Sequence, residues 1–400
     1  MILSERSKYS VNPIEETNNA ARELEQQGKR ITRLNIGDPT RYFPTPKYII
    51  EAYVDALRNG KTSYTTAGGL PELREAVAGE YRGQADVGAD DVLITSGVSE
   101  ALMFLNSIMI NDGDSALIMR PYYSMYNSFL NIMGGESVYA DLDEKTGWGL
   151  DTDALSRMLA MERKHIKYMM LANPNNPTGT VLGRKELAEI ADLANEHGIV
   201  LISDEIYDRI TFNGAKFTSI AEMAKGMPHI ILNGASKVLD ATGFRIGYVI
   251  IPEKDAGSES LKRKLAEYTT LRLSANTPAE HAVLEGLRNK AERKKSVEHM
   301  VREIADRCNY ATDLVNGSEY MEAVRPKGAF YIFPRVRMDA LRIRDDKELV
   351  DRLLKEELVL LSRGSGFGAE SHVRIVGLPT KDVLELAITK LDAFLSRNRR

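Results

Sequence analysis

The chain has 400 residues, of which 43% are apolar and 28% charged, with a formal net charge of −4 at pH 7. This length predicts two domains, and the negative charge excludes an electrostatic attraction to nucleic acid or to an acidic membrane. A single cysteine, Cys308, excludes an intrachain disulfide and a thiolate metal cluster.

We expect a cytoplasmic protein without a metal site. The N-terminus shows no signal-peptide pattern, and no window approaches the ~18 uninterrupted apolar residues of a membrane span. A lone thiol fits a reducing compartment.

The first forty residues predict a helix and a short strand. A mixed helical pattern over Pro13–Gln27 ends at Gly28, and residues 30–36 have strand character before Gly37. We interpret residues 1–40 as an N-terminal arm that packs with a smaller domain.

The middle of the chain alternates strand and helix signals. Helical patterns such as Ser99–Met109 and Arg184–Glu196 separate apolar runs. The candidate strands are Val92–Thr95, Ser115–Met119, Ser137–Tyr139, Lys167–Ala172, Gly198–Ser203, His229–Leu232 and Gly247–Ile251. This alternation predicts an α/β domain of three layers over residues 41–284, in which helices cover both faces of a mostly parallel seven-stranded sheet.

The pattern changes toward the C-terminus. Residues 254–308 are charged and helical, and strand-like pieces follow at Ala329–Phe333 and His372–Val376. We therefore expect a smaller α+β domain over residues 285–400. A ligand site is expected at the carboxyl ends of the large sheet, facing this domain.

The run from Asn233 to Tyr248 is the most informative stretch. Lys237 follows an apolar strand candidate and precedes Arg245 by eight residues. A lysine at a strand end can form a Schiff base with a carbonyl cofactor when its pKa is lowered, and an arginine can clamp a phosphate. The alternative is a solvated lysine and a surface arginine around a glycine turn.

A glycine turn joins a strand to a helix at residues 93–102. The backbone N–H groups of Val98 and Ser99, with the Ser99 hydroxyl, would point at an anion at the helix N-terminus. The alternative is a capping serine, Ser96 or Ser99, with Glu100 in the first turn.

Polar side chains follow two further strands. Asn176 lies in a loop with two Asn-Pro steps, where its amide can donate to a phenolate oxygen. Asp204 follows a buried strand, where a carboxylate is costly unless it is paired, for example with a protonated pyridine nitrogen. Tyr207 could then reach the neighbouring phenolate. The alternative is that Asp204 caps the next helix.

These four segments, in this order, resemble the class I aminotransferases of the fold-type-I pyridoxal 5′-phosphate enzymes, from about residue 34 to residue 379. The resemblance implies catalytic roles for Lys237, which would hold the cofactor covalently, and for Asp204 and Tyr207. The implied cofactor contacts are Tyr64, Gly97, Val98, Ser99, Tyr123, Asn176, Asp204, Tyr207, Ser236, Lys237 and Arg245. The implied substrate contacts are Gly37, Asn176 and Arg374.

The resemblance also implies a homodimer with shared active sites, because Tyr64 matches a tyrosine that reaches the partner's phosphate. Two of these residues have structural alternatives. Tyr123 would stack on the pyridine ring or pack in the core, and Arg374 would bind the substrate carboxylate or form a surface ion pair.

Two features depart from the family or stay open. Many relatives have a serine where this chain has Gly234, so one phosphate contact is missing or replaced, with Ser99 as a candidate. No residue is evident for the distal carboxylate of glutamate, and Arg41 and Arg272 are candidates by location.

Within the family, the likeness is strongest to alanine aminotransferases of archaeal and bacterial type, through residues 34–39, 97–101, 271–278, 326–334 and 364–368. It implies ping-pong exchange of an amino group between L-alanine and 2-oxoglutarate. The alternatives are an aspartate, aromatic or broad-specificity aminotransferase, a β-lyase or decarboxylase, and a non-catalytic sensor. The segment before residue 35 is too short for the DNA-binding module of such a sensor.

Overall fold

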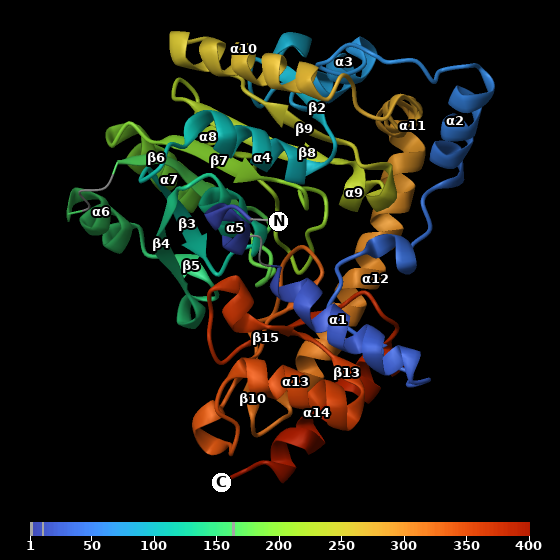
Figure 1. Cartoon of the computed structure of the whole chain (residues 1–400), viewed down its shortest axis with the longest axis vertical. Helices are drawn as coiled ribbons and strands as arrows, with labels where there is room; N and C mark the ends of the chain where they lie inside the picture. Colours follow the sequence, from blue (N-terminus) through green and yellow to red (C-terminus); the bar gives the residue numbers. More distant parts are fainter. Residues whose placement is uncertain (1–2, 10–11, 162–164) are drawn as a thin grey trace.

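The computed structural model describes residues 3–9, 12–161 and 165–400. Figure 1 shows a large α/β part and a smaller part, with the long helix α12 (Lys290–Asn316) running from one to the other. Within the described ranges, no helix combines the length and the apolar character that crossing a membrane requires.

The large part is built on one sheet, with the strand order β2-β9-β8-β7-β6-β3-β4-β5. The pairs β8–β9, β2–β9 and β4–β5 are antiparallel and the others are parallel. The strands are β2 (Val92–Thr95), β3 (Ser115–Arg120), β4 (Glu136–Asp143), β5 (Gly149–Leu150), β6 (Ile166–Ala172), β7 (Val200–Asp204), β8 (His229–Gly234) and β9 (Gly247–Ile250). The predicted mostly parallel α/β sheet is confirmed, and the two-residue β5 extends the seven predicted strands at one edge.

Helices cover both faces of this sheet because its strands carry apolar side chains on both sides. In β7, Leu201 and the adjacent Ile202 belong to opposite apolar clusters. One cluster includes α2 (Lys47–Arg58), α3 (Pro71–Glu80), α6 (Thr152–Met161), α7 (Arg184–Glu196), α8 (Ile220–Met223) and α11 (Thr277–Arg288). The other includes α4 (Val98–Met109), α5 (Met125–Ile132) and α10 (Ala256–Leu271). The sheet and the helices on its two faces form the three predicted layers, because both faces of the sheet are apolar and must be covered.

The smaller part contains α13 (Asp346–Glu357), α14 (Lys381–Arg397) and a three-stranded antiparallel sheet. This sheet has the order β11 (Tyr331–Ile332), β15 (Val373–Val376), β14 (Ser362–Arg363). Short strand pairs flank it, formed by β10 (Met321–Glu322) with β12 (Arg335–Val336) and by β1 (Thr32–Arg33) with β13 (Val359–Leu360).

The N-terminal segment lies against the smaller part. Residues 30–36 were expected to form a strand, but only β1 does, because only Thr32 and Arg33 pair with β13. Helix α1 (Pro13–Gln26) precedes it, and Glu16 of α1 forms an ion pair with Arg363. The domain limits at residues 40 and 284 stay a prediction.

Candidate active site

A cavity of about 400 Å³ lies at the carboxyl ends of β6, β7 and β8 and is bordered by α1 and β15. The site residues expected from the sequence that line it are Gly37, Val98, Ser99, Tyr123, Asn176, Asp204, Tyr207, Ser236, Lys237, Arg245 and Arg374. The structure therefore brings together, around one space, side chains that are spread over more than three hundred residues of the chain.

Lys237 lies on α9 (Ala235–Val238), a single helical turn that follows β8 directly. Its Nζ donates a hydrogen bond to the carbonyl oxygen of Gly37 at 2.7 Å. Burial lowers the pKa of Lys237 to about 8, against the opposing effect of the Asp38 carboxylate and with the help of the Arg374 charge. The neutral amine, which is the nucleophilic form, is thus easier to reach than in a solvated lysine.

Asp204 is the last residue of β7 and is only 5% exposed. The Tyr126 hydroxyl donates to its Oδ2 at 2.7 Å, and the backbone N–H of Ile206 donates to Oδ1 at 3.2 Å. Burial raises the pKa of Asp204 to about 6. Residues 206–209 form a turn and no helix, so the helix-capping alternative is wrong. A cationic N–H in the cavity would stabilise this carboxylate.

Arg374 lies on the central strand β15 and is 1% exposed, so the surface ion-pair alternative is wrong. Its Nη1 donates to Oδ1 of Asn176 at 2.9 Å, and its Nη2 donates to the carbonyl oxygen of Asn35 at 2.7 Å. The rings of Tyr331 and Phe367 lie 4.5 and 4.4 Å from its Cζ. Among the described residues, its buried Nε has no hydrogen-bond partner. These contacts hold the guanidinium in place and leave a donor for a carboxylate.

Tyr331 is a site residue that sequence reasoning missed. Its hydroxyl lies 2.8 Å from the Tyr207 hydroxyl, and it lines the cavity. A Cβ on Gly37 would lie 2.2 Å from the Tyr331 hydroxyl oxygen, so this approach requires glycine. The run from Pro326 to Pro334, part of the family likeness, was the available signal. Tyr126 and Asn18 of α1 also line the cavity, and no sequence pattern pointed to either of them.

The phosphate end of the cavity combines a helix N-terminus with an arginine. Helix α4 begins after Gly97, which has φ +79° and no side chain to cap it, so the capping-serine alternative is wrong. Arg245 donates from Nη1 to the carbonyl oxygen of Thr242 at 3.0 Å and from Nη2 to that of Ser96 at 3.3 Å. The guanidinium is thereby held beside the N–H groups of Val98 and Ser99, an arrangement that suits a phosphate.

Gly97 keeps this end open, and Gly97→Ala is expected to weaken cofactor binding about ten- to a hundredfold, the effect of one lost charged hydrogen bond. The new Cβ would lie 2.3 Å from Nη2 of Arg245 and would displace the guanidinium. Fluorescence titration of the cofactor-free protein measures this. Gly198→Ala is the matched control, because Gly198 also has positive φ (+64°) but has open space around its Cβ position. Equal losses in both variants would contradict the steric explanation.

Gly234 explains the departure from the family at the serine position. Gly234 pairs with Gly247 where β8 meets β9. A Cβ on Gly234 would lie 2.7 Å from the carbonyl oxygen of Ile246 and 2.8 Å from the Gly247 Cα. A serine here would push β9 away from β8, so phosphate contacts must come from other side chains. Ser99 and Ser236 both line the cavity.

Neither arginine suggested for a distal carboxylate lines the cavity. Arg272 donates to Glu100 from Nε at 2.9 Å and to the carbonyl oxygen of Ile94 from Nη2 at 2.6 Å. Arg41 has a half-exposed side chain, and its Nε lies 3.5 Å from Oδ2 of Asp38. Arg272 is therefore engaged in structural contacts, whereas Arg41 remains free to reorient.

Tyr64 does not line the cavity of its own chain. It is 75% exposed, and the nearby Leu271 and Leu273 are 79% and 51% exposed. Thr277 donates to the carbonyl oxygen of Ser63 at 2.8 Å, which places the Tyr64 turn beside the segment after Leu273. Within its own chain, Tyr64 therefore has no place in the active-site cavity.

The cavity fits pyridoxal 5′-phosphate. Arg245 and the N-terminus of α4 suit its phosphate, the buried Asp204 suits a protonated ring nitrogen, and Lys237 suits its carbonyl. The unpartnered Nε of Arg374, the part of the guanidinium that still lacks an acceptor within the described chain, suits a substrate carboxylate. One cavity thus contains two arginines that suit anions and a lysine amine.

Comparisons with known proteins identify the family. Residues 29–391 match the family model "Aminotransferase class I and II". The chain is 33% identical over 386 residues to glutamate-pyruvate aminotransferase AlaA of Escherichia coli K12, covering 94% of this chain and 93% of that one. Among solved structures, the alanine aminotransferase from Pyrococcus furiosus is 34% identical with a TM-score of 0.93, covering 99% of this chain and 100% of that one. The aspartate aminotransferase from Thermus thermophilus with maleate is 30% identical with a TM-score of 0.89, at 99% and 100% coverage. The chain belongs to the class I and II aminotransferases, the pyridoxal-phosphate enzymes that exchange amino groups between amino acids and 2-oxo acids.

Proposed function

We propose that this aminotransferase moves an amino group between L-alanine and 2-oxoglutarate in two half-reactions. The observation that carries the proposal is the pairing of Arg374 with Asn176 beside Lys237 in one small cavity. This pair can hold an α-carboxylate while the lysine amine faces Cα. Relatives named for alanine and pyruvate support the choice of donor.

The cofactor-holding roles follow from the cavity lining. Arg245, Val98, Ser99 and Ser236 would hold the phosphate, and Asn176 and Tyr207 would donate to the ring oxygen. Tyr123 would stack on the ring. When bound, pyridoxal phosphate supplies a carbonyl that takes up the amino group and a ring that withdraws electrons. Asp204 would accept the ring N–H and so keep that nitrogen protonated.

The substrate-handling roles fall on Arg374, Asn176, Gly37 and Lys237. Arg374 would orient the amino acid by its α-carboxylate so that the Cα–H bond faces Lys237. Nζ of Lys237 would take the Cα proton and later return one, and a pKa near 8 suits both directions close to neutral pH. Gly37 holds Nζ through its carbonyl oxygen and leaves room for Tyr331.

The donor preference is tested by single-turnover conversion of the bound cofactor with a panel of amino acids. We expect alanine and glutamate to react fastest, because alanine needs only the α-carboxylate contact of Arg374 and glutamate adds the distal contact proposed below for Arg41. If aspartate or phenylalanine outpaces alanine, the alanine assignment is wrong. Release of ammonia or carbon dioxide in place of a new amino acid would indicate a lyase or decarboxylase.

Arg41 is proposed as the donor to the distal carboxylate of glutamate. It follows the Gly37 segment and has a half-exposed side chain. Loss of such a charged hydrogen bond corresponds to about 1.5–3 kcal/mol, or roughly ten- to a hundredfold in kcat/KM. In the same panel, Arg41→Ala should slow glutamate by this factor and leave alanine unchanged. An unchanged glutamate rate would exclude this role.

We also propose a homodimer with shared active sites, in which Tyr64 reaches the phosphate of the partner subunit. The exposure of Tyr64 supports this arrangement. Dilution to the monomer should release cofactor and activity together, as followed by sedimentation and absorbance. A fully active monomer would refute the dimer.

A further inference from the structure

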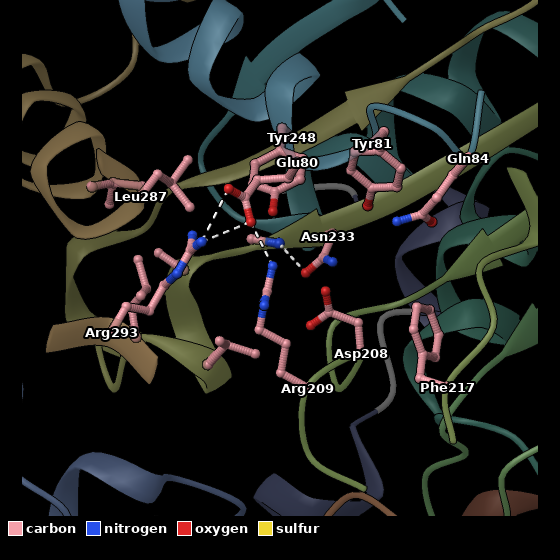
Figure 2. A pocket seen from close by; sticks show the side chains of 15 residues that line it. Glu80, Tyr81, Gln84, Asp208, Arg209, Phe217, Asn233, Tyr248, Leu287 and Arg293 are labelled. Atoms are coloured by element: carbon pink, nitrogen blue, oxygen red, sulfur yellow. Dashed lines mark hydrogen bonds and ion pairs between the residues drawn. The ribbon is translucent and has the colours of Figure 1, made fainter. Parts of the chain in front are cut away.

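A second cavity, of about 230 Å³, is bordered by α9, the helical turn that carries Lys237. Figure 2 shows the side chains that line this cavity. Helix α9 forms the wall between the two cavities. Ser236 and Lys237 line the active-site cavity, whereas the neighbouring Ala235 and Val238 line the second one. The turn after β7 is shared in the same way, with Tyr207 on the active-site side and Asp208 on the other. A ligand here would touch the backbone that positions the catalytic groups.

The positive and negative side chains that line this second cavity are equal in number. Glu80 accepts hydrogen bonds from Nη2 of Arg293, at 3.0 and 2.9 Å, and is also ion-paired with Arg209. Asp208 lies beside Arg209 on the same turn (Figure 2). Two carboxylates thus face two guanidiniums, so the lining suits a ligand that carries both signs of charge and no net charge.

Arg293 supplies the specific donor. It is 5% exposed, and both of its hydrogen bonds to Glu80 leave from Nη2. Its Nη1 is buried and, within the described part of the chain, has no hydrogen-bond partner. A buried N–H of a charged group is costly to leave unsatisfied, and a ligand oxygen would satisfy it.

The remaining lining combines polar and apolar groups. The side chains of Tyr81, Asn233 and Asp208 converge on the same space in Figure 2. Val283 and Leu287 of α11 form an apolar wall. At ~30 Å³ per water molecule, the cavity of about 230 Å³ has the volume of about eight waters, enough for a small amino acid.

We propose that this cavity binds a small zwitterionic amino acid with an aliphatic side chain, separately from the catalytic cavity. Its carboxylate would accept from Nη1 of Arg293, its ammonium group would lie at Asp208, and its side chain would contact Leu287. An adjoining surface depression, lined by Lys290 and Lys294 together with Glu80, Arg209 and Arg293, is the route of entry. A bound ligand would contact Ala235 and Val238, the two residues of α9 that flank Ser236 and Lys237.

The test is equilibrium dialysis of the holoenzyme with radiolabelled 2-aminoisobutyrate, an amino acid without a Cα hydrogen for Lys237 to remove. Arg374→Lys serves as the background because it weakens the α-carboxylate site of the catalytic cavity. We expect this enzyme to bind one probe molecule per chain. No binding up to the solubility limit of the probe would overturn the proposal.

A second substitution in this background locates the probe. Arg293→Lys keeps the charge beside Glu80 but removes Nη1, and it should weaken binding about ten- to a hundredfold, as the loss of one charge-assisted hydrogen bond does. The control Lys295→Gln removes a neighbouring exposed charge that lines neither the cavity nor the depression, and it should leave the affinity unchanged. Unchanged affinity in Arg293→Lys would overturn the proposal.

Two further measurements test the position of the ligand and its charge. Leu287→Phe places a larger side chain in the space beside the apolar wall and should also weaken binding. This variant keeps the test decisive if Arg293→Lys fails to fold. Isobutyrate, which has the carboxylate but no ammonium group, should bind at least about tenfold more weakly than the amino acid. Equal binding of isobutyrate would overturn the assignment of a zwitterionic ligand. Because dialysis measures binding and not turnover, the result is independent of the amino donor proposed above.

Discussion

Lys237→Ala is expected to abolish turnover and, at the same time, the visible absorbance of the lysine-bound cofactor. The variant loses Nζ, which donates a hydrogen bond to the carbonyl oxygen of Gly37. This one atom would both bond to the cofactor and act as the base. Loss of the proton-transfer role alone corresponds to about 10²–10⁴-fold in rate. Steady-state kinetics and an absorbance spectrum of the same sample measure both effects.

The matched control is Lys225→Ala, which removes an exposed lysine on the loop before β8. It should retain the spectrum and the activity of the wild-type enzyme. An active Lys237→Ala enzyme would exclude Lys237 as the catalytic lysine. Retained absorbance without turnover would separate its two roles and assign the bond to another amine.

Arg374→Ala is expected to lower kcat/KM for every amino acid by roughly 30- to 5,000-fold while the cofactor stays bound. Truncating one member of a buried, hydrogen-bonded charge pair costs about 2–5 kcal/mol. Here the lost guanidinium is the group that Asn176 and the Asn35 carbonyl hold in place. Half-reaction kinetics with several donors, together with the cofactor spectrum, measure the effect.

Arg363→Ala provides the comparison on the neighbouring strand β14. Arg363 pairs with Glu16 of α1 and does not line the cavity. A partly exposed ion pair contributes at most about 1 kcal/mol, so kcat/KM should stay within about fivefold. A loss restricted to one donor in Arg374→Ala would contradict a role at the α-carboxylate, which all amino acids share.

The elements with strong local signals were predicted from the sequence. The expected strand at Val92–Thr95 and the expected helix at Arg184–Glu196 coincide with β2 and α7. Such elements follow from the spacing of apolar residues and from flanking glycines, which are properties of neighbouring residues. The strand predicted at 30–36 comprises only Thr32 and Arg33 in the structure, because its length depends on a partner strand more than three hundred residues away.

The position of the site was also predictable. Asp204 ends β7, and Asn176 and Lys237 follow its two parallel neighbours, β6 and β8. The carboxyl ends of parallel strands share one edge, so these side chains must meet there. Their order along the chain and the spacing of Lys237 and Arg245 then indicated the cofactor.

What the sequence by itself determined was the identity of the chemical groups and the edge of the sheet at which they gather. Only the tertiary structure decided which partner each group has. Tyr126 bonds to Asp204, Tyr331 approaches Gly37, and Arg272 is engaged by Glu100. The second cavity likewise joins α3, α11 and α12 around α9. These contacts depend on how layers pack across distances of tens to hundreds of residues, and no local pattern of side chains encodes that packing.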